Sequence, residues 1–460
     1  MAQKIVIKIG GSNLTDINSL SKIIKIINQY EKPVIIVVSA FFGITNSLIE
    51  ILEDVLNKQE NVKSEIDKIR AYKFQILEHY ITDKNLLKEA KTGIETLIDE
   101  LEKYLYGVAY IGETPDFLSD KILSYGERLS SSMINAIFNN NGIVCNEVLP
   151  AQIGLRTNDR YGDASVDFAN CTTDLEQVFN QDQVYVVPGF YGISSQGKVN
   201  LLGRGGTDYS AACIARLVHA KSLDIWKDVN GFMSADPKVV QNPIRIDHLS
   251  YSEAAELAYF GANILHPRTI EPLINTNIPI RLFDIGALNG SLEPLTHINA
   301  SDSEVSGIVK SITSSREFSV LKLKGPGLGY KPGILATITT SLNYADINIK
   351  SVITSQIAIN FLLSAKDLKK SAKIISALAL DEVNEVIPVK DIAVVAVVGQ
   401  GILEQPGIGY KIFKSLADEN INVLMSTLGG SDVVCYLVID KNHEKTAITK
   451  IHDTFFTKTN

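Results

Sequence analysis

The chain has 460 residues, enough for about three domains at roughly 150 residues each. Apolar residues make up 45%, and 44 Lys and Arg against 52 Asp and Glu leave a net charge of −8, which excludes a protein built to coat nucleic acid or an anionic membrane. Four scattered cysteines without a CxxC pair exclude a zinc ribbon, and with no signal-peptide pattern at the N-terminus they favour a reducing cytoplasm.

Residues 1–295 are predicted to form one large α/β domain. Apolar runs at Lys4–Lys8 and Val34–Ser39 are typical of strands buried on both faces, as in a parallel sheet. Helical spacing over Leu20–Tyr30 lies between them, so a right-handed βαβ unit is expected to open the chain. Further strands are predicted at Val184–Val187 and Ser222–Trp226, and further helices at Asp208–His219 and Ser252–Phe260.

A segment rich in Lys and Glu, residues 57–105, interrupts this domain. Its apolar residues recur at helical spacing, which predicts a solvated amphipathic helical insert. A lid or a dimer surface is the functional alternative.

The last third of the chain contains an internal repeat. Pro332-Gly333-Ile334 recurs as Pro406-Gly407-Ile408, and the following helix and strand keep the same offset of 74 residues (406 − 332). Two βαββαβ-type units of about 70 residues explain this pattern, at 312–388 and 389–460, with strands that could interleave. Neither copy holds a cluster of reactive side chains, so binding or regulation is expected there.

Two glycine-rich loops are candidates for anion binding. Lys8-Ile9-Gly10-Gly11-Ser12 ends the first strand, where glycines let backbone N–H groups approach an anion and Lys8 adds positive charge. Leu202–Asp208 (LGRGGTD) precedes a second helix, and Arg204 can hold a carboxylate in a fork. Each alone could be a plain turn with a capping residue, but together in one α/β domain they favour an anionic ligand.

Other polar segments are less specific. Asp224–Gly231 ends another predicted strand, where carboxylates can face a nucleotide or its metal. Ser124–Arg128 and Arg156–Gly162 are polar clusters, of which the first could form only a surface ion pair. His266 before Pro267 is interpreted as structural and is not assigned as a base.

Taken together, these segments resemble the amino acid kinase family and, within it, the aspartate kinases, over essentially the whole chain. The motifs that carry the resemblance are Lys8–Asn13, Ser39–Asn46, Ser124–Glu127, Arg156–Gly162, Gly203–Asp208, Asp224–Gly231, Phe260–Ala262 and Leu265–Pro267. The repeat is similar to the family's paired ACT domains. The resemblance implies an α/β fold with an open, mainly parallel sheet sandwiched by helices, followed by two ferredoxin-like ACT domains.

The resemblance implies phosphorylation of the β-carboxylate of L-aspartate by MgATP to 4-phospho-L-aspartate, the first step toward lysine, threonine and methionine. A monofunctional enzyme is expected, with magnesium carried by ATP and with no organic cofactor or structural metal. A carboxylate nucleophile is already ionised at pH 7, so no general base is required. The demand is for Lys, backbone N–H groups and Mg²⁺ to spread the charge of a loose transition state.

Site roles follow from the resemblance, position by position. Aspartate would be held by Thr45, Glu127, Phe190, Arg204 and Thr207, with Glu127 on the ammonium and Arg204 on a carboxylate. Lys8 and Asp208 would be the catalytic pair, in which Asp208 organises Lys8 and the loops. The positions expected to contact ATP or its phosphates are Lys8, Gly10, Gly11, Ser12, Lys227, Asp228, Met233, Lys238 and Asn263.

Several of these positions depart from the family pattern. Asn263 stands where most relatives carry a lysine that reaches the ATP phosphates. Lys227 stands where a threonine is common, and we hypothesise that it partly replaces the missing charge. Ser12 and Asn13 replace Thr and Ser, and Met233 replaces a common Tyr.

The resemblance also implies feedback regulation by an amino acid, lysine or threonine, and a homodimer or larger assembly paired through the ACT domains. The turn Gly327–Pro332 and a neighbouring strand are the candidate effector site. The strand positions assigned to it are Asn348, Lys350, Ser351, Thr354, Ser355 and Gln356. Relatives inhibited by lysine tend to carry an acidic residue near Lys350, so threonine is favoured over lysine.

Two other functions are compatible with parts of the pattern. A non-catalytic amino acid sensor would explain Asn263, but it has no need of a phosphate-side Lys8. A glutamate or acetylglutamate kinase would share the opening glycines and would leave the tandem repeat unexplained.

Overall fold

The computed structural model describes residues 3–15, 18–58, 62–262, 264–286, 292–300 and 308–457. The chain folds into two compact units. The first is formed by Met1–Phe232, Arg245–Ala255 and Asn263–Glu304, and the second by Met233–Ile244, Glu256–Ala262 and Val305–Asn460. Asn263, predicted to contact ATP, lies outside the described residues.

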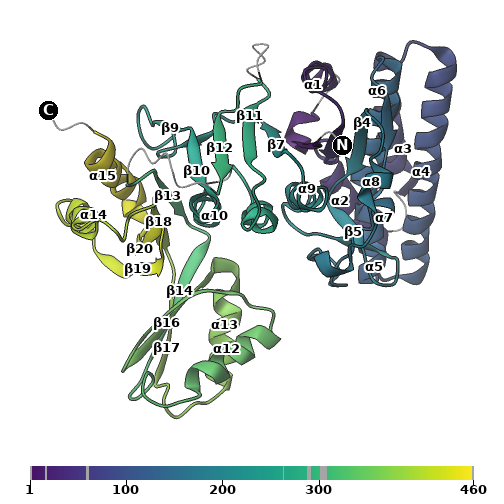
Figure 1. The fold of residues 1–460 in the computed structure, drawn as a ribbon. Coiled ribbons are helices and arrows are strands. Elements are labelled where there is room, and N and C mark those ends of the chain that lie inside the picture. The colour runs from purple at the N-terminus through teal and green to yellow at the C-terminus, as the bar shows by residue number, and fades with distance from the viewer. Residues whose placement is uncertain are drawn as a thin grey trace. The chain divides into compact units, whose positions relative to one another are not determined.

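An eight-stranded sheet forms the centre of the first unit, in the order β10-β12-β11-β7-β1-β2-β4-β3 (Figure 1). Its strands are β1 (Ile5–Ile9), β2 (Val34–Val38), β3 (Cys145–Glu147), β4 (Val184–Pro188), β7 (Ser222–Lys227), β10 (His248–Ser250), β11 (Ile280–Asp284) and β12 (Thr296–Asn299). Within this sheet, as far as the structure describes it, only the β11–β12 pairing is antiparallel. The mainly parallel sheet expected from the buried apolar runs is therefore confirmed.

The sheet places two predicted strand ends next to each other. β1 lies between β2 and β7, with Ile5 opposite both Val34 and Ser222. β2 is buried along its whole length, because helices cover both faces of a parallel sheet. The side chains that follow these strands at their carboxyl ends are therefore brought together, and open α/β sheets bind their ligands at this edge.

Helices and short hairpins complete the first unit. The helices are α1 (Ser19–Ile27), α2 (Ile44–Lys58), α3 (Val62–Tyr80), α4 (Lys84–Ile111), α5 (Asp116–Leu123), α6 (Tyr125–Asn140), α7 (Pro150–Ile153), α8 (Leu175–Val178), α9 (Gly206–Leu217), α10 (Tyr251–Tyr259, shared with the second unit) and α11 (Pro267–Ile270). Strands β5 (Tyr191–Ile193) and β6 (Val199–Leu201) form a hairpin, and β8 (Phe232–Met233) pairs with β9 (Arg245–Ile246).

The Lys- and Glu-rich segment forms two long helices, α3 and α4, which lie side by side (Figure 1). Asp83 caps α4 by accepting hydrogen bonds from the backbone N–H groups of Asn85 and Leu86. The buried face of α3 is apolar apart from Lys73, which is fully buried.

The second unit contains two four-stranded antiparallel sheets, β15-β16-β14-β17 and β13-β18-β20-β19. The elements are β13 (Ser311–Ser315), β14 (Phe318–Lys324), α12 (Ile334–Tyr344), β15 (Ile349–Ser355), β16 (Ala358–Ser364), α13 (Leu368–Ala377), β17 (Glu385–Val389), β18 (Ile392–Val398), α14 (Ile408–Ala417), β19 (Val423–Ser431), β20 (Val434–Asp440) and α15 (Glu444–Phe456). β13 falls within the range predicted for the first repeat, but it pairs with β18 of the second.

The internal repeat has a structural basis at its two helix starts. Gly333 and Gly407 precede α12 and α14 with φ of +90° and +88°, a conformation that glycine adopts without strain. The offset of 74 residues grows to 76 (434 − 358) between β16 and β20. The register shift between Leu428 and Ser431 of β19 accounts for the two extra residues.

The predicted boundary at residue 295 differs from the observed division. Residues 233–244 and 256–262 belong to the second unit. The reason is tertiary: the Ser234 carbonyl accepts from the Ile312 N–H at 2.8 Å, and the Ser234 hydroxyl lies 2.9 Å from His452 Nε2. The Phe260 ring packs 5.2 Å from that of Tyr436.

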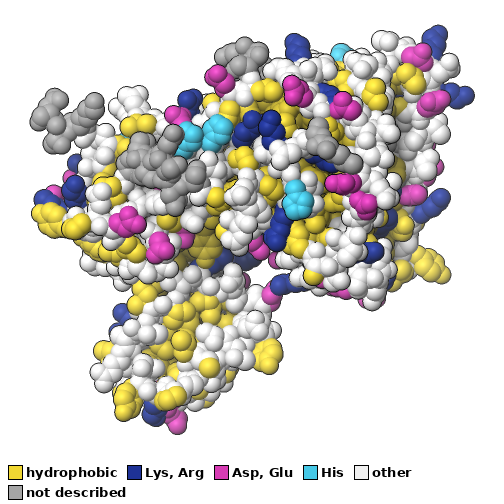
Figure 2. All heavy atoms as spheres, viewed as in Figure 1, with side chains coloured by type: hydrophobic (Ala, Val, Ile, Leu, Met, Phe, Trp, Pro, Cys, Tyr) yellow, Lys and Arg dark blue, Asp and Glu magenta, His cyan; other side chains and the backbone are white. Residues whose placement is uncertain are grey.

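Charged side chains of both signs are interspersed over the face shown in Figure 2. This agrees with the small net charge of −8. In the described parts of the chain, every helix is too short or too polar to cross a bilayer.

Candidate active site

Two lysines contact one buried carboxylate at the carboxyl ends of β1 and β7. Lys8 Nζ lies 2.5 Å from Asp208 Oδ1, and Lys227 Nζ lies 3.0 Å from Asp208 Oδ2. Lys227 Nζ also donates to the Ile264 carbonyl at 2.6 Å. Asp208 is in the first turn of α9, so the parallel neighbours β1 and β7 bring both lysines to the start of that helix.

The charged groups in this cluster shift one another's pKa values. Burial alone would raise the pKa of Asp208, but Lys8 and Lys227 hold it well below its usual value, so the carboxyl is ionised. Burial lowers the pKa of Lys8, an effect that the attraction of Asp208 opposes and the repulsion of Lys227 increases. Two lysines on one carboxylate make this region suited to an anionic ligand.

Glycines allow the two loops to approach the cluster closely. A Cβ on Gly10 would lie 2.9 Å from Lys8 Nζ, and one on Gly11 would lie 2.7 Å from the Ala40 carbonyl oxygen. Gly205 has φ +72°, and a Cβ there would lie 2.5 Å from the His266 ring. Ser12 is exposed in the short 3-10 turn after β1. Larger residues at these glycines would push the loops apart.

A cavity of about 480 Å³ opens beside the cluster. The predicted residues that line it are Lys8, Phe190, Arg204, Thr207 and Asp208. Arg204 is exposed, whereas Thr207 and Asp208 are buried. The structure therefore brings together residues from β1, from the LGRGGTD loop and from the turn after β4.

Glu127 and Thr45 are not among the residues that line this cavity, which include Ser39. Glu127 is in the first turn of α6 and is 3% exposed, and the Ala40 N–H donates to its carboxylate. Burial raises the pKa of Glu127 to about 8, against hydrogen bonds from Ala40 and its own N–H and against the charges of Lys73 and Lys8. Thr45 is in α2, and its Oγ1 would lie 3.6 Å from a Cβ on Gly126.

Lys73, which is buried in α3, was not among the residues predicted for the site. Its Nζ lies 4.0 Å from the centroid of the Phe41 ring, and burial lowers the pKa of Lys73 to about 7. A usable signal was present, because Lys73 occupies an apolar-face position of the helical pattern, four residues after Ile69 and three before Ile76.

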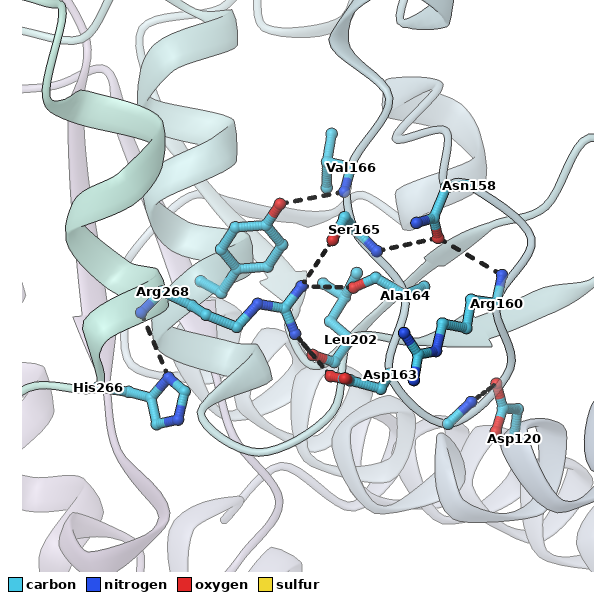
Figure 3. Close-up of polar contacts among 12 residues, drawn as sticks. Asp120, Asn158, Arg160, Asp163, Ala164, Ser165, Val166, Leu202, His266 and Arg268 are labelled. Carbon is cyan, nitrogen blue, oxygen red and sulfur yellow. Dashed lines mark hydrogen bonds and ion pairs between the residues drawn. The ribbon is translucent and has the colours of Figure 1, made fainter. Parts of the chain in front are cut away.

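Figure 3 shows Arg268 between Leu202, at the start of the second glycine loop, and Asp163 and Ala164, which follow the Arg156–Gly162 segment. Arg268 donates to the carbonyls of Leu202 and Ala164 at 2.5 and 2.6 Å and pairs with Asp163 at 2.9 Å. Asp120 accepts from the N–H groups of Gly162 and Leu201 at 3.0 and 2.8 Å. Asp120 and Arg268 were not predicted, because each acts through contacts distant in sequence.

His266 has the structural role that the sequence indicated. Its Nδ1 accepts a hydrogen bond from the Arg268 N–H at 3.4 Å at the start of α11, and its ring packs against Gly205 (Figure 3). Burial and the neighbouring Arg268 charge lower the pKa of His266, so the ring is neutral near pH 7.

The remaining predicted nucleotide positions are more scattered. Asp228 is exposed just after β7. Met233 ends β8, and Lys238 is exposed in the turn where its N–H donates to Asp236. Met233 and Lys238 belong to the second unit. Within the residues that the structure describes, His, Cys, Asp and Glu nowhere gather in threes that could hold a metal ion.

The predicted effector positions follow one another along β15. Ser351 Oγ accepts from the Tyr436 hydroxyl at 2.5 Å, which links the two ACT-type sheets. Lys350 Nζ lies 4.9 Å from the centroid of the Tyr259 ring. The turn at Gly329 reaches the other end of the strand, where its N–H donates to the Gln356 carbonyl. Asn348, Thr354, Ser355 and Gln356 are exposed.

Comparison with known proteins gives matches over nearly the whole chain. The model of the amino acid kinase family matches residues 3–284, and an ACT domain model matches residues 395–455. A bifunctional aspartokinase/homoserine dehydrogenase of Haemophilus influenzae is 29% identical over 98% of this chain. The chain spans 56% of that relative's length.

Three further matches cover almost the whole length of both compared proteins. Lysine-sensitive aspartokinase 3 of Escherichia coli is 28% identical over 99% of this chain and 100% of its own. The crystal structure of E. coli aspartokinase III with aspartate and ADP matches with a TM-score of 0.82 at 27% identity, over 99% of this chain and 100% of that one. Its complex with lysine and aspartate matches with a TM-score of 0.78.

Proposed function

Because the chain belongs to the amino acid kinase family, whose model spans residues 3–284, we propose that it is an aspartate kinase. It transfers the γ-phosphoryl group of MgATP to the β-carboxylate of L-aspartate. The observation that carries this proposal is the contact of Lys8 and Lys227 with Asp208 between two glycine loops, beside a cavity lined by Arg204.

The protein has to contribute little covalent chemistry to this reaction. One bond forms between a β-carboxylate oxygen of aspartate and the γ-phosphorus, while the bond from that phosphorus to the bridging oxygen of ADP breaks. The aspartate carboxylate is already ionised, so no proton has to be removed. Lys8 and the backbone N–H groups of Gly10 and Gly11 balance the charge of the transferring group, and Asp208 holds Lys8 in place.

The substrate is recognised by its three charges. Arg204 pairs with a carboxylate of aspartate, and Glu127 accepts hydrogen bonds from its ammonium group. Thr45, Phe190 and Thr207 complete the aspartate site. The cavity of about 480 Å³ at Arg204, Phe190 and Thr207 supports this assignment. A planar guanidinium is the side chain best matched to a carboxylate.

The nucleotide binds with its phosphates toward Lys8 and Lys227. Lys227 supplies a charge that relatives take from a lysine at the position of Asn263. Support comes from the Lys227 ammonium, which shares Asp208 with Lys8 rather than pointing to solvent. Ser12, Asp228, Met233, Lys238 and Asn263 are assigned to the same nucleotide, and magnesium arrives with ATP.

Regulation is assigned to the ACT-type repeats. An amino acid, lysine or threonine, binds near Asn348–Gln356, and the charge of Lys350 favours threonine. One E. coli relative is described as lysine-sensitive, which supports an amino acid effector. β15 and β19 are edge strands whose free hydrogen-bonding edges suit pairing with a second copy, so a homodimer is proposed. Location in the cytoplasm stays a prediction.

The proposal is tested by trapping the product with hydroxylamine. The chain is incubated with MgATP and L-aspartate, with L-glutamate as the control substrate and with lysine and threonine added separately. Hydroxamate from aspartate alone is the expected result, and the inhibited reaction identifies the effector. Absence of hydroxamate from a folded, ATP-binding sample would contradict the kinase and favour the amino acid sensor.

A further inference from the structure

Lys73 of α3 is buried in a way that packing alone does not require. It is 0% exposed, and its Nζ has no hydrogen-bond partner among the described residues. Its neighbours on the buried face of α3 are apolar, including Ile69 and Ile76. Burying an ammonium group without a hydrogen-bond partner is costly, and a contact with an aromatic ring offsets only part of that cost. Methionine would fill the same space without that cost.

The surroundings of Lys73 lead to Glu127. Lys73 Nζ lies over the ring of Phe41, and the preceding residue, Ala40, donates its N–H to the Glu127 carboxylate. Glu127 Oε2 is likewise buried without a hydrogen-bond partner. Two buried ionisable groups, an amine and a carboxyl, therefore approach the Ala40–Phe41 segment, and each acts electrostatically on the other.

Other groups near Glu127 cannot serve as its counter-charge. Lys8 of β1 acts on it but is already paired with Asp208 at 2.5 Å. Tyr191 of β5 also faces it, and burial raises the pKa of that phenol, so it stays neutral. Lys73 is the cation left for Glu127 among the groups that act on this carboxylate.

We propose that Lys73 is a positioning residue of the aspartate site, whose buried ammonium group makes the Glu127 carboxyl easier to ionise when the ammonium group of the substrate binds. The inference rests on the proposed function, since it assigns the substrate ammonium to Glu127. It gives the α3–α4 insert a part in substrate binding rather than only in packing. Without Lys73, the pKa of Glu127 would be higher still, and ionising this carboxyl when aspartate binds would cost more free energy.

The test replaces Lys73 by methionine, which matches its length and suits its apolar surroundings. At pH 7 the KM for L-aspartate is expected to rise about tenfold, the effect of raising the pKa of Glu127 by about one further unit. The KM for ATP should stay unchanged, and the aspartate defect should shrink at pH 8.5, where Lys73 of the wild type has lost most of its charge because its pKa is about 7. If Lys73 had only a structural role, the KM for L-aspartate would not change separately from the KM for ATP. It would also not return toward the wild-type value at higher pH.

Lys91→Met is the matched control. Lys91 lies in α4 of the same insert, with its Nζ 5.1 Å from the Phe74 ring centroid, and it pairs with Glu78 at the surface. This variant should leave both KM values unchanged. Lys73→Gln removes the charge while keeping a polar end, and it must give the same rise if the methionine variant does not fold.

An unchanged KM for aspartate in a folded Lys73 variant, or equal rises for aspartate and ATP, would overturn the proposal. Failure of the proposed function is recognised separately, because the wild-type chain would then form no aspartyl hydroxamate. In that case the Kd of L-aspartate is compared by calorimetry. Binding weakened only by the Lys73 variants would support the inference, and no binding to wild type would refute it.

Discussion

Asp208 and Glu127 are two carboxylates of the same unit, nearly equally buried at 5% and 3% exposure, but with opposite shifts in pKa. The pKa of Asp208 lies well below its usual value, whereas that of Glu127 is raised to about 8. Asp208 contacts two ammonium groups, at 2.5 and 3.0 Å. Glu127 accepts backbone hydrogen bonds, and the charge of Lys73 acts on it without a direct contact. At equal burial, direct contact with a cation decides the charge.

This difference matches the proposed roles. Asp208 is a permanent anion that fixes two lysines, so it suits a catalytic framework that must not change between turnovers. Glu127 is a carboxyl whose charge depends on a partner, so it suits a receptor for the ammonium of a substrate. Variants of the two carboxylates and of their lysines test whether Asp208 and Glu127 differ in this way.

Asp208→Asn should have the largest effect. The neutral side chain leaves Lys8 and Lys227 without their shared partner, so both lose their fixed positions. A fall in kcat of roughly 100- to 1,000-fold is expected, as for loss of one preorganised group in other enzymes. The hydroxamate assay measures it, and circular dichroism checks the fold. A kcat within threefold of wild type would show that Asp208 is not the organising anion.

Glu127→Gln should come next, and it should act on a different constant. An amide cannot supply the negative charge for the substrate ammonium, so the KM for L-aspartate is expected to rise about 30-fold, or ~2 kcal/mol. The KM for ATP serves as the internal control and should change little. If both rise together, Glu127 does not belong to the aspartate site and the contrast with Asp208 is lost.

Lys227→Thr restores the residue common in relatives and should have a smaller effect. Lys8 keeps its contact with Asp208, but the phosphates lose one positive charge. The KM for ATP is expected to rise about fivefold, equivalent to ~1 kcal/mol. Lys221→Thr, an exposed lysine just before β7, is the matched control. An unchanged KM for ATP would remove Lys227 from the nucleotide site.

The smallest effect concerns stability and pH. Since the pKa of Glu127 is raised from 4.5 to about 8, the folded chain keeps a proton that the unfolded chain has released. Wild-type stability should therefore fall as the pH rises from 4.5 toward 8. Glu127→Gln lacks this ionisation, so its Tm relative to wild type should be several degrees higher at pH 7 than at pH 5.5.

The pH range from 5.5 to 7 distinguishes the effect of Glu127 on stability from that of Lys73. Burial lowers the pKa of Lys73 to about 7, so it adds stability with rising pH only above that value. Parallel Tm curves for wild type and Glu127→Gln between pH 5.5 and 7 would mean that Glu127 has an ordinary pKa in the folded chain.

Local patterns were enough to predict much of the fold. Five-residue apolar runs such as Val34–Val38 indicated buried parallel strands, and glycine loops at Gly10-Gly11 and Gly203–Gly206 indicated where backbone approaches a ligand. The offset between Gly333 and Gly407 revealed two similar units, each with a glycine at its helix start. These features are encoded within a few residues, because periodicity and backbone freedom are local properties.

Tertiary structure decided what depends on distant segments meeting. β13 pairs with β18 far along the chain, for example Thr313 opposite Ala396 (396 − 313 = 83), because sheet pairing follows the geometry of the fold rather than the order of the repeat. Lys227 turns toward Asp208, and Lys73 is buried near Glu127, through packing that no local pattern contains. The sequence determined which ionisable groups are present, but their charges depend on burial and on cations brought close by the fold.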